Sequence, residues 1–389
     1  LLNHIPKHFG QQNHYEMPQP LIMRILLLGE YSNVHRTLAD GLRSLGHEVV
    51  TASNGDFWKN YPRDIDLSRP AGPLAGLRLW LKVIRKIRQF RGFDIVQIIN
   101  PLFLELKAEH LFPIFAYLKK HNKKIILCAF GMDYYWVKRS EEMIFRYGDF
   151  NIGDTIRHTV EADKARRDWL GTSKERLNKY CANLSDAIVT GLYEYDACYR
   201  PLFPDKTTFI PYPIKPSASH EITSSANKPI RIFIGISKAR SAYKGTDIML
   251  QAATDLKKKY SERVDLQIAE AIPFQQYRNM MLGSDMILDQ LYSYTPAMNA
   301  LEAMSHGIIC VGGGEPENYD ILGETTLRPI INVHPDYNSV YKELENLILH
   351  PEILPILKQQ SIEYIARHHD FIKVARKYEE LYTTSFINK

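Results

Sequence analysis

The chain has 389 residues, of which 45% are hydrophobic and 24% charged, and its formal net charge is +5. These proportions are typical of a globular protein with room for two domains, and they exclude a disordered or low-complexity chain. The mild basicity does not indicate a nucleic-acid partner, and no apolar run reaches the ~18 residues that cross a bilayer.

The ends and the cysteines bear on the cellular setting. Residues 1–22 lack the apolar core of a signal peptide, and we predict an N-terminal extension or expression remnant outside the fold. The four cysteines show no CxxC or paired metal spacing, and Cys128 and Cys310 lie in apolar runs, as small buried hydrophobic side chains do. This pattern favours a reduced, cytoplasmic setting.

Strands and helices alternate from residue 23 onward. Continuous apolar runs such as 23–29 indicate strands that are buried on both faces. The predicted strands of the first half are 23–29, 47–53, 94–100, 123–130, 187–190 and 207–213. The predicted helices are 34–45, 76–91, 111–121, 136–170, 174–184 and 192–199, and residues 54–75 are predicted to form a long loop.

A second alternating series follows a linker predicted at 214–228, which is rich in Ser, Pro and Thr. Its predicted strands are 229–236, 264–271, 285–291, 308–311 and 330–333, and its predicted helices are 246–260, 273–282, 296–306 and most of 336–385. The pattern predicts an α/β protein with two doubly wound parallel-sheet (Rossmann-like) domains that face each other across a cleft. The predicted domains are 23–213 and 229–371, and the helix 372–389 is expected to pack back on the first domain.

Residues 295–317, TPAMNALEAMSHGIICVGGGEPE, predict a helix whose start is open to an anion. Thr295 is expected to cap it and Pro296 suits its first position, so free N–H groups would point at a ligand. Glu302 follows two turns later on the same face, where its carboxylate can hold a diol such as a ribose. The glycine turn 312–314 permits close backbone approach. An ordinary capped helix with a glycine loop is the alternative.

Cationic side chains follow the first strand of the second half. The loop 237–245, SKARSAYKG, carries Lys238, Arg240 and Lys244. Arginine clamps a phosphate with two hydrogen bonds, and lysine acts as a point charge. We therefore expect these cations to meet ligand phosphates; a solvated basic loop is the alternative.

Two strand ends of the first half carry further candidates. The turn after the first strand, GEYSNVHR, is not a GxGxxG fingerprint. We expect Asn33 or His35 in this turn to contact a ligand, and a role only in capping the next helix is the alternative. The turn after the fourth strand ends in Asp133, which can accept hydrogen bonds from sugar hydroxyls. An ordinary loop carboxylate is the alternative for Asp133.

The helix predicted over residues 77–91 is basic and carries no acidic residue. Such an amphipathic helix can lie on an anionic membrane surface, and an ordinary core helix with a basic outer face is the alternative. No nucleic-acid-binding module accompanies it, so we expect no nucleic-acid partner. The sequence also lacks a Walker loop, a GxSxG elbow and a carboxylate–histidine metal pattern, and we expect no metal and no cofactor.

Four segments, taken in order, resemble glycosyltransferases of the GT-B fold, specifically the family 4-like group that retains anomeric configuration and uses nucleotide sugars. The segments are MRILLLG…HRTLADGLRSLGHEVVTAS, SDAIVTGLYEYDA…TTFIPYPI, GISKARSAYKG and LEAMSHGIICVGGGEPE. The resemblance covers about residues 23–386, and the last segment is the most specific.

The resemblance implies roles by position. Glu302 matches the carboxylate that binds the nucleotide ribose, and Lys244 with Lys238 or Arg240 matches the basic pair on the donor diphosphate. The donor-binding residues implied in this way are Gly29, Asn33, Gly235, Tyr294, Thr295, Pro296, Ala297, Met298, Asn299, Glu302, Gly313, Gly314 and Glu317. The candidates for catalysis are Lys244, Arg240, Lys238, His35 and Asp133.

Three positions depart from the family pattern. Tyr294 stands where the family often has the first of two glutamates, so the backbone of 295–299 and Asn299 are expected to contact the sugar instead. Phe130 stands where members often have histidine, and the usual arginine of the basic loop is displaced, with Lys238 and Arg240 sharing a longer loop. These departures imply an altered donor choice or a lost activity.

The resemblance implies transfer of a hexose from a UDP- or GDP-type sugar to a saccharide or lipid-linked acceptor in cell-surface glycan synthesis. The protein is expected in the cytoplasm or on the inner face of the cytoplasmic membrane. A nucleotide-sugar epimerase or an inverting transferase on the same fold, with His35 as the base to test, is one alternative. A catalytically silent GT-B binding protein is the other.

Overall fold

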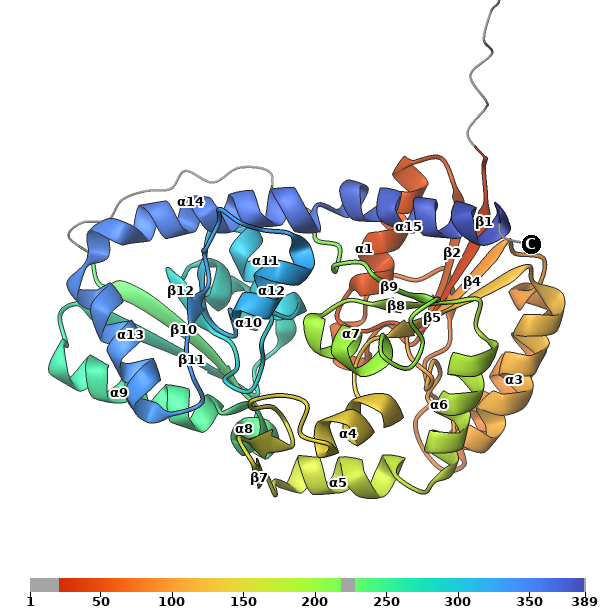
Figure 1. Ribbon diagram of the computed structural model, residues 1–389, viewed down its shortest axis with the longest axis horizontal. Coiled ribbons are helices and arrows are strands. Elements are labelled where there is room, and N and C mark those ends of the chain that lie inside the picture. The colour runs from red at the N-terminus through yellow and green to blue at the C-terminus, as the bar shows by residue number, and fades with distance from the viewer. Residues whose placement is uncertain (1–20, 218–227, 388–389) are drawn as a thin grey trace, which may run out of the picture.

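The computed structural model describes residues 21–217 and 228–387 of the chain. Two parallel sheets lie side by side, each between layers of helices (Figure 1). The predicted α/β fold with two doubly wound sheets is confirmed. Nearly all of the predicted extension 1–22 and most of the predicted linker 214–228 lie outside the described residues.

The first sheet has the strand order β3-β2-β1-β4-β5-β8-β9, and all its strand pairs are parallel. Its central strands are buried on both faces, which accounts for their continuous apolar sequences. The chain leaves β1 first toward β2 and later toward β4, so the switch point of the sheet lies between β1 and β4. The strands are β1 (Arg24–Leu28), β2 (Glu48–Ser53), β3 (Ile65–Asp66), β4 (Ile95–Ile98), β5 (Lys124–Ala129), β8 (Ala187–Thr190) and β9 (Thr207–Phe209).

The prediction of a helix over 136–170 is wrong in its middle. Residues 142–159 contain a small antiparallel hairpin, because glycines at 148 and 153 and neighbouring Asp and Asn residues favour turns over a helix. The hairpin is β6 (Asn151–Ile152) and β7 (Thr155–Ile156). The helices of the first half are α1 (Val34–Ser44), η1 (Phe57–Lys59), α2 (Ala75–Lys86), η2 (Ile87–Phe90), α3 (Ala108–His121), α4 (Tyr134–Glu141), α5 (Val160–Trp169), α6 (Ser173–Leu184) and α7 (Tyr193–Tyr199).

The second sheet has the order β11-β10-β12-β13-β14 and is also parallel throughout, with its switch point between β10 and β12. Its strands are β10 (Ile230–Ile236), β11 (Val264–Glu270), β12 (Met286–Leu288), β13 (Ile309–Gly312) and β14 (Ile331–Asn332). Its helices are η3 (Lys238–Arg240), α8 (Ser241–Lys244), α9 (Thr246–Lys259), α10 (Phe274–Leu282), α11 (Met298–Ser305), α12 (Pro316–Leu322), α13 (Tyr337–Leu349), η4 (Pro351–Ile353), α14 (Leu354–Tyr364) and η5 (Ile365–His369).

The last helix, α15 (Phe371–Ile387), returns to the first half and lies along α1 (Figure 1). The two helices approach closely at Gly41, where an added Cβ would lie 2.5 Å from the carbonyl oxygen of Phe371. The hydroxyl of Tyr382 donates a hydrogen bond of 2.7 Å to Gln97 on β4. The chain thus crosses between the halves twice, and the second crossing adds apolar core to the first half.

Candidate functional site

Three cations from both halves gather where the loop after β10 meets the loop after β2. Burial lowers the pKa of Lys244 at the end of α8, the carboxylate of Asp289 opposes this shift, and Arg240 and Lys59 reinforce it. Lys59 comes from η1 in the first half, and its ammonium pairs with Asp56 at 2.7 Å and donates to Ser32 Oγ at 3.1 Å. We name Lys59, Arg240 and Lys244 the cation group. Such a group suits an anion with several charges, such as a diphosphate.

The start of α11 lies beside the cation group. The helix begins at Met298, two residues later than predicted, with Ala297 in the N-cap position. The carboxylate of Asp289, just after β12, accepts hydrogen bonds from the backbone N–H of Ala297 and from the side chain of Asn299. Asp289 therefore links Lys244 to the helix start, and the predicted cap by Thr295 is wrong.

Glu302 lies on α11 and is partly exposed, as a ligand-binding carboxylate must be. Its Oε1 atom pairs with Nε of Arg278 on α10 at 3.0 Å. Tyr61 of the first half also lies near Glu302. Burial is the main cause of the raised pKa of Tyr61, and the negative charge of Glu302 raises that pKa further. Trp58 of η1 packs edge-on against Phe274 of α10 with ring centroids 5.3 Å apart. Glu302 thus lies at the junction of the halves, and its ribose contact stays a prediction.

Tyr294 and Thr295 lie in a tightly packed contact between the halves. Glu194, a buried residue of α7, accepts hydrogen bonds from the backbone N–H groups of Tyr294 at 2.7 Å and of Thr295 at 3.2 Å. The hydroxyl of Thr295 donates to the same carboxylate at 2.5 Å. The ring of Tyr294 is only 2% exposed and stacks on Tyr193, and its hydroxyl accepts from the backbone N–H of Arg146 at 2.7 Å. Both residues therefore join the halves. The ring of Tyr294 is enclosed by neighbouring side chains, which leaves no space beside it for the sugar contact implied for this position.

The segment 142–159 makes a second contact between the halves. Arg146 pairs with Glu315 at 2.7 Å and also with Glu317, the residue implied to meet the donor. The hydroxyl of Tyr147 donates to Glu315 at 2.5 Å. Sequence reasoning missed Arg146, because a lone arginine in a segment expected to be helical gives no signal for a contact across the molecule.

The glycines implied to contact a donor serve packing in the structure. A Cβ on Gly313 would lie 2.0 Å from the carbonyl oxygen of Ser293, and one on Gly235 would lie 2.7 Å from the ring of Tyr277. Gly314 donates its backbone N–H to the side chain of Asn332 at 3.0 Å. The close neighbours of these glycines are parts of this chain, and the donor contact implied for them stays a prediction.

The turn after β1 is tightly packed and is buried at its start. Gly29 has a φ of +89°, and a Cβ there would lie 2.3 Å from Ile99; Asn33 is left-handed with a φ of 72°. His35 is 1% exposed, with Nδ1 2.8 Å from the carbonyl oxygen of Gly29 and Nε2 3.2 Å from Gln97. Burial lowers the pKa of His35 to about 4, so its ring is neutral at physiological pH. His35 therefore stabilises the turn through its contact with the carbonyl oxygen of Gly29.

Two further candidates lie away from the junction or below the surface. Asp133 is fully buried, accepts from the backbone N–H of Trp136 at 2.8 Å as the cap of α4, and accepts from Tyr199 at 2.5 Å. Burial raises the pKa of Asp133 to about 6. Lys238 is 82% exposed and pairs with Glu270, so it stands outside the cation group.

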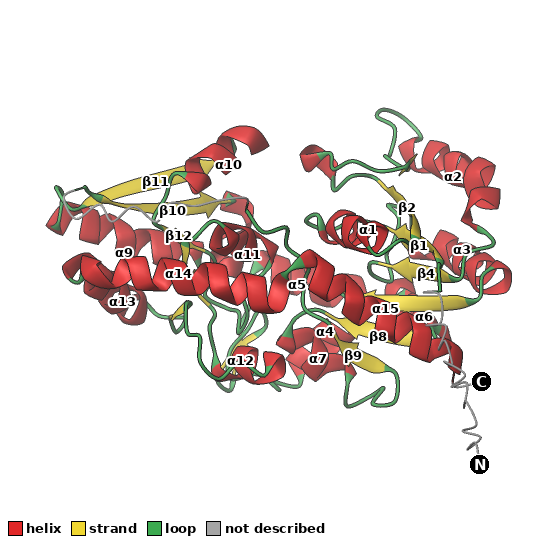
Figure 2. Cartoon of the chain, turned by 90° about the horizontal axis from the view of Figure 1, so that it is seen from above, coloured by secondary structure: helices red, strands yellow, loops and turns green. Residues whose placement is uncertain are grey.

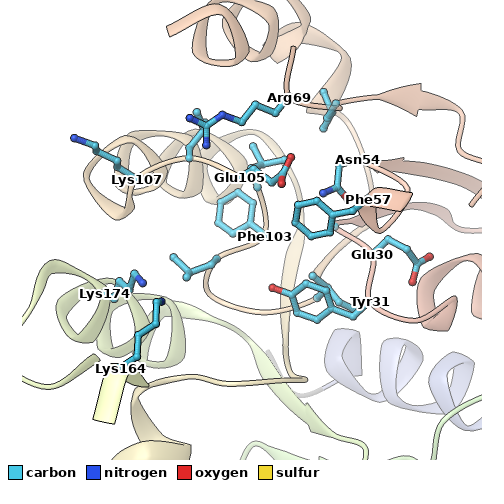
Figure 3. A pocket seen from close by; sticks show the side chains of 16 residues that line it. Glu30, Tyr31, Asn54, Phe57, Arg69, Phe103, Glu105, Lys107, Lys164 and Lys174 are labelled. Carbon is cyan, nitrogen blue, oxygen red and sulfur yellow. The ribbon is translucent and has the colours of Figure 1, made fainter. Parts of the chain in front are cut away.

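A cavity of about 700 Å³ lies in the first half at the carboxyl ends of β1, β2 and β4 (Figure 3). These strands flank the switch point of the sheet, where doubly wound proteins bind ligands. The turn 29–31 forms one end, and the loop 99–107 after β4 forms a wall. The sequence could place the strand ends but not the loop that closes over them.

The described residues contain no group of three or more His, Cys, Asp or Glu side chains placed to hold a metal ion, and none of their helices is long and apolar enough to cross a membrane. All four cysteines are buried and free, as predicted for Cys128 and Cys310.

Solved structures share this architecture. Sucrose-phosphate synthase from Thermosynechococcus elongatus is 13% identical, with a TM-score of 0.62 over 94% of this chain and 100% of that one. HepE from Anabaena, in complex with UDP and glucose, is 13% identical, with a TM-score of 0.56 over 93% and 100%. A putative UDP-N-acetylglucosamine 2-epimerase from Listeria monocytogenes is 10% identical, with a TM-score of 0.51 over 92% and 95%.

The sequence matches no protein-family model and no curated protein. At these identities the likeness concerns the fold, and it covers both parallel sheets. The chain therefore has the GT-B fold, with the two Rossmann-like domains of the nucleotide-sugar glycosyltransferases among its structural neighbours.

Proposed function

We propose that the protein is a family 4-like glycosyltransferase that moves a hexose from a nucleotide-diphosphate sugar to a saccharide or lipid-linked acceptor, with retention, in cell-surface glycan synthesis. The observation that carries the proposal is the cation group of Lys59, Arg240 and Lys244 at the start of α11, with Glu302 on the same helix. Cations there match a diphosphate, and a partly exposed carboxylate about one turn along matches a ribose. The donor is of the UDP or GDP type.

In the proposed reaction an acceptor oxygen bonds to the anomeric carbon on the face from which the diphosphate leaves. The bond from that carbon to the diphosphate oxygen breaks, and the diphosphate keeps the electron pair and takes the acceptor proton. The cation group stabilises the charge that develops on the diphosphate, and one such interaction contributes about 3 kcal/mol to lowering the barrier. Rotation of the halves toward each other would exclude water and limit hydrolysis.

Release of UDP or GDP from a panel of nucleotide sugars, with a mixture of saccharide acceptors, tests the activity. Glu302→Ala tests the donor position by calorimetry with UDP and GDP. We expect about tenfold weaker nucleotide binding, since a lost hydrogen-bonding carboxylate costs about 1.4 kcal/mol. Glu343→Ala on α13, also partly exposed, is the control and should bind as the wild type does. Unchanged binding in Glu302→Ala would remove Glu302 from the donor site.

An epimerase or inverting transferase remains the enzymatic alternative, because a putative epimerase shares the fold. The environment of His35 disfavours it as a general base, since its ring is buried and its two nitrogens already have neighbours, Gly29 in the turn and Gln97 on β4. Product analysis by NMR separates the cases, because an epimerase converts the donor sugar without any acceptor.

A catalytically silent binding protein is the alternative from another class. It is favoured by Tyr294, whose ring is packed between the halves where the family often has a glutamate. Such a protein would bind nucleotides in calorimetry but would release no nucleoside diphosphate from a nucleotide sugar with any acceptor.

We also propose that the protein docks on the inner face of the cytoplasmic membrane through α2, which lies at the outer edge of the first sheet (Figure 2). One face of this helix and the residue before it carry exposed apolar side chains at spacings of three and four. The helix has no acidic residue, so its cations complement an anionic lipid surface. The exposed apolar residues are Leu74, Leu77, Leu81 and Ile84.

Flotation with phosphatidylcholine vesicles, with and without phosphatidylglycerol, tests this docking. Neutralising Arg85, Lys86 and Arg88 to glutamine should weaken binding to the anionic vesicles about a hundredfold, at about 1 kcal/mol per cation. The triple change R263Q/K342Q/R376Q, at three exposed cations outside α2, removes the same charge and is the control. Equal binding of the triple variant and the wild type would disprove the docking.

A further inference from the structure

We propose that the cavity at the carboxyl ends of β1, β2 and β4 takes an acceptor with an anionic group, such as a phosphate, at one end and hydroxyls at the other. The inference rests on the proposed function, because it names the acceptor class of that transferase. The cavity starts at the Gly29 turn, and the neighbouring Ser32 bonds to Lys59 of the cation group. An acceptor in the cavity would therefore end next to the proposed donor.

Four cations lie around the outer part of the cavity (Figure 3). Lys164 and Lys174 share a single carboxylate, Asp168, at 2.8 and 3.0 Å, so the three side chains together carry one net positive charge. Arg69 and Lys107 are exposed and form no ion pair within the described parts of the chain. Unpaired cations around a concave surface raise the local concentration of anions.

The opposite end of the cavity is close to neutral. Figure 3 shows Glu30 and Tyr31 across the cavity from Lys107, Lys164 and Lys174. Burial raises the pKa of Glu30 to about 8, although its carboxyl accepts hydrogen bonds from two backbone N–H groups at the start of α1. Both oxygens of Glu30 are engaged by those N–H groups, and the phenol of Tyr31, which points into the cavity in Figure 3, offers hydrogen bonds to hydroxyls without adding a negative charge. The cavity therefore changes from neutral and polar at the turn to positive at its mouth.

The middle of the cavity is apolar and has room for a sugar ring. Phe57, Leu102, Phe103 and Leu106 line it, and Phe57 is 64% exposed although it is aromatic. A flat apolar surface between polar ends suits the apolar face of a pyranose. The volume of about 700 Å³ is typical of small-molecule sites. Two acidic side chains, Glu30 and Glu105, also line the cavity, and the four lining cations outnumber them.

Calorimetry with glucose 6-phosphate, glucuronate and glucose tests the preference without any donor. Glucose 6-phosphate should bind about tenfold more tightly than glucose, and Arg69→Gln with Lys107→Gln should remove that advantage, since each exposed cation contributes up to about 1 kcal/mol. Phe57→Ala should weaken all three sugars alike. Vesicles of phosphatidylcholine with a polyprenyl phosphate replace the soluble phosphate in a second arm, which separates a lipid-linked source from a free one.

The control is K342Q/R376Q, which removes two exposed cations elsewhere and should bind every probe as the wild type does. Equal affinity for glucose and both anionic sugars, with no vesicle binding that depends on Arg69 and Lys107, would overturn the inference. Tight glucuronate binding would support it, with a carboxylate as the anion. Nucleotide binding is measured separately and should not change in R69Q/K107Q. A wild-type protein that binds no nucleotide would disprove the proposed function. The sugar and vesicle measurements test the cavity independently of that result.

Discussion

Residues 293–295 and 297–302 belong to one short segment that runs from the loop after β12 into α11, yet their surroundings differ sharply. The first three are buried against α7 and donate their hydrogen bonds to Glu194 across the junction. The second group starts α11, where Asp289 lies close to Lys244, Glu302 pairs with Arg278, and residues 297–299 and 302 stay partly exposed. One part of the segment therefore fixes the position of the two halves, and the other part is left to meet a ligand.

The largest expected effect concerns the ligand side of this comparison. Lys244→Met keeps the length of the side chain and removes the charge that would face the diphosphate. We expect kcat/KM for nucleotide-sugar turnover to fall by about 10² to 10³, the usual cost of one lost electrostatic contact to a developing charge. Steady-state assays of nucleotide release measure it.

Lys238→Met is the matched control, because this lysine follows the same strand but is exposed and paired with Glu270. Its turnover should stay within about threefold of the wild type, as for a surface ion pair. Similar losses in both variants would mean that the whole loop, and not the cation group, supports catalysis.

The next effect concerns the structural side. Glu194→Ala leaves the N–H groups of Tyr294 and Thr295 and the hydroxyl of Ser293 without their buried acceptor. We expect a loss of about 3 kcal/mol in the free energy of unfolding, measured by urea denaturation. The exposed Glu352 offers the control Glu352→Ala, which should change stability by less than about 0.5 kcal/mol.

A smaller effect should appear in the pH dependence of stability. Burial raises the pKa of Glu194 above its ordinary value of 4.5, so the folded state binds the proton more tightly than the unfolded state. Stability from this group is therefore greatest below pH 4.5 and falls as the pH rises through the raised pKa, by at most about 1.4 kcal/mol per pH unit. Glu194→Gln should lack this decline when the free energy of unfolding is measured in urea from pH 4 to 8. If its stability falls with pH as steeply as that of the wild type, the decline comes from other buried carboxyls.

The residues proposed for the ligand side were accessible to sequence reasoning, whereas those that join the halves were not, and the reason is physical. Lys244, Arg240 and Glu302 are carried by local patterns, a strand followed by a basic loop or a helix with its start near an anion site. Lys59 and Glu194 act across the junction, on residues more than 90 positions away in the sequence. The periodicity of hydrophobic residues within one helix or strand gives no information about such contacts. The hairpin in 142–159 was missed for a related reason, because its aromatic and charged residues are selected for contact with the second half and mimic an amphipathic helix.

The smallest effect decides what Tyr294 does. Tyr294→Phe keeps the ring stacked on Tyr193 and removes only the hydroxyl that accepts from the backbone N–H of Arg146. We expect a loss of about 1 kcal/mol in stability and no change in the relative rates with different donor sugars. A shift in donor preference with unchanged stability would show that the hydroxyl meets the sugar in a conformation with the halves moved apart. The boundary between the two parts of the segment would then lie before residue 294, because a side chain that only joins the halves cannot distinguish one sugar from another.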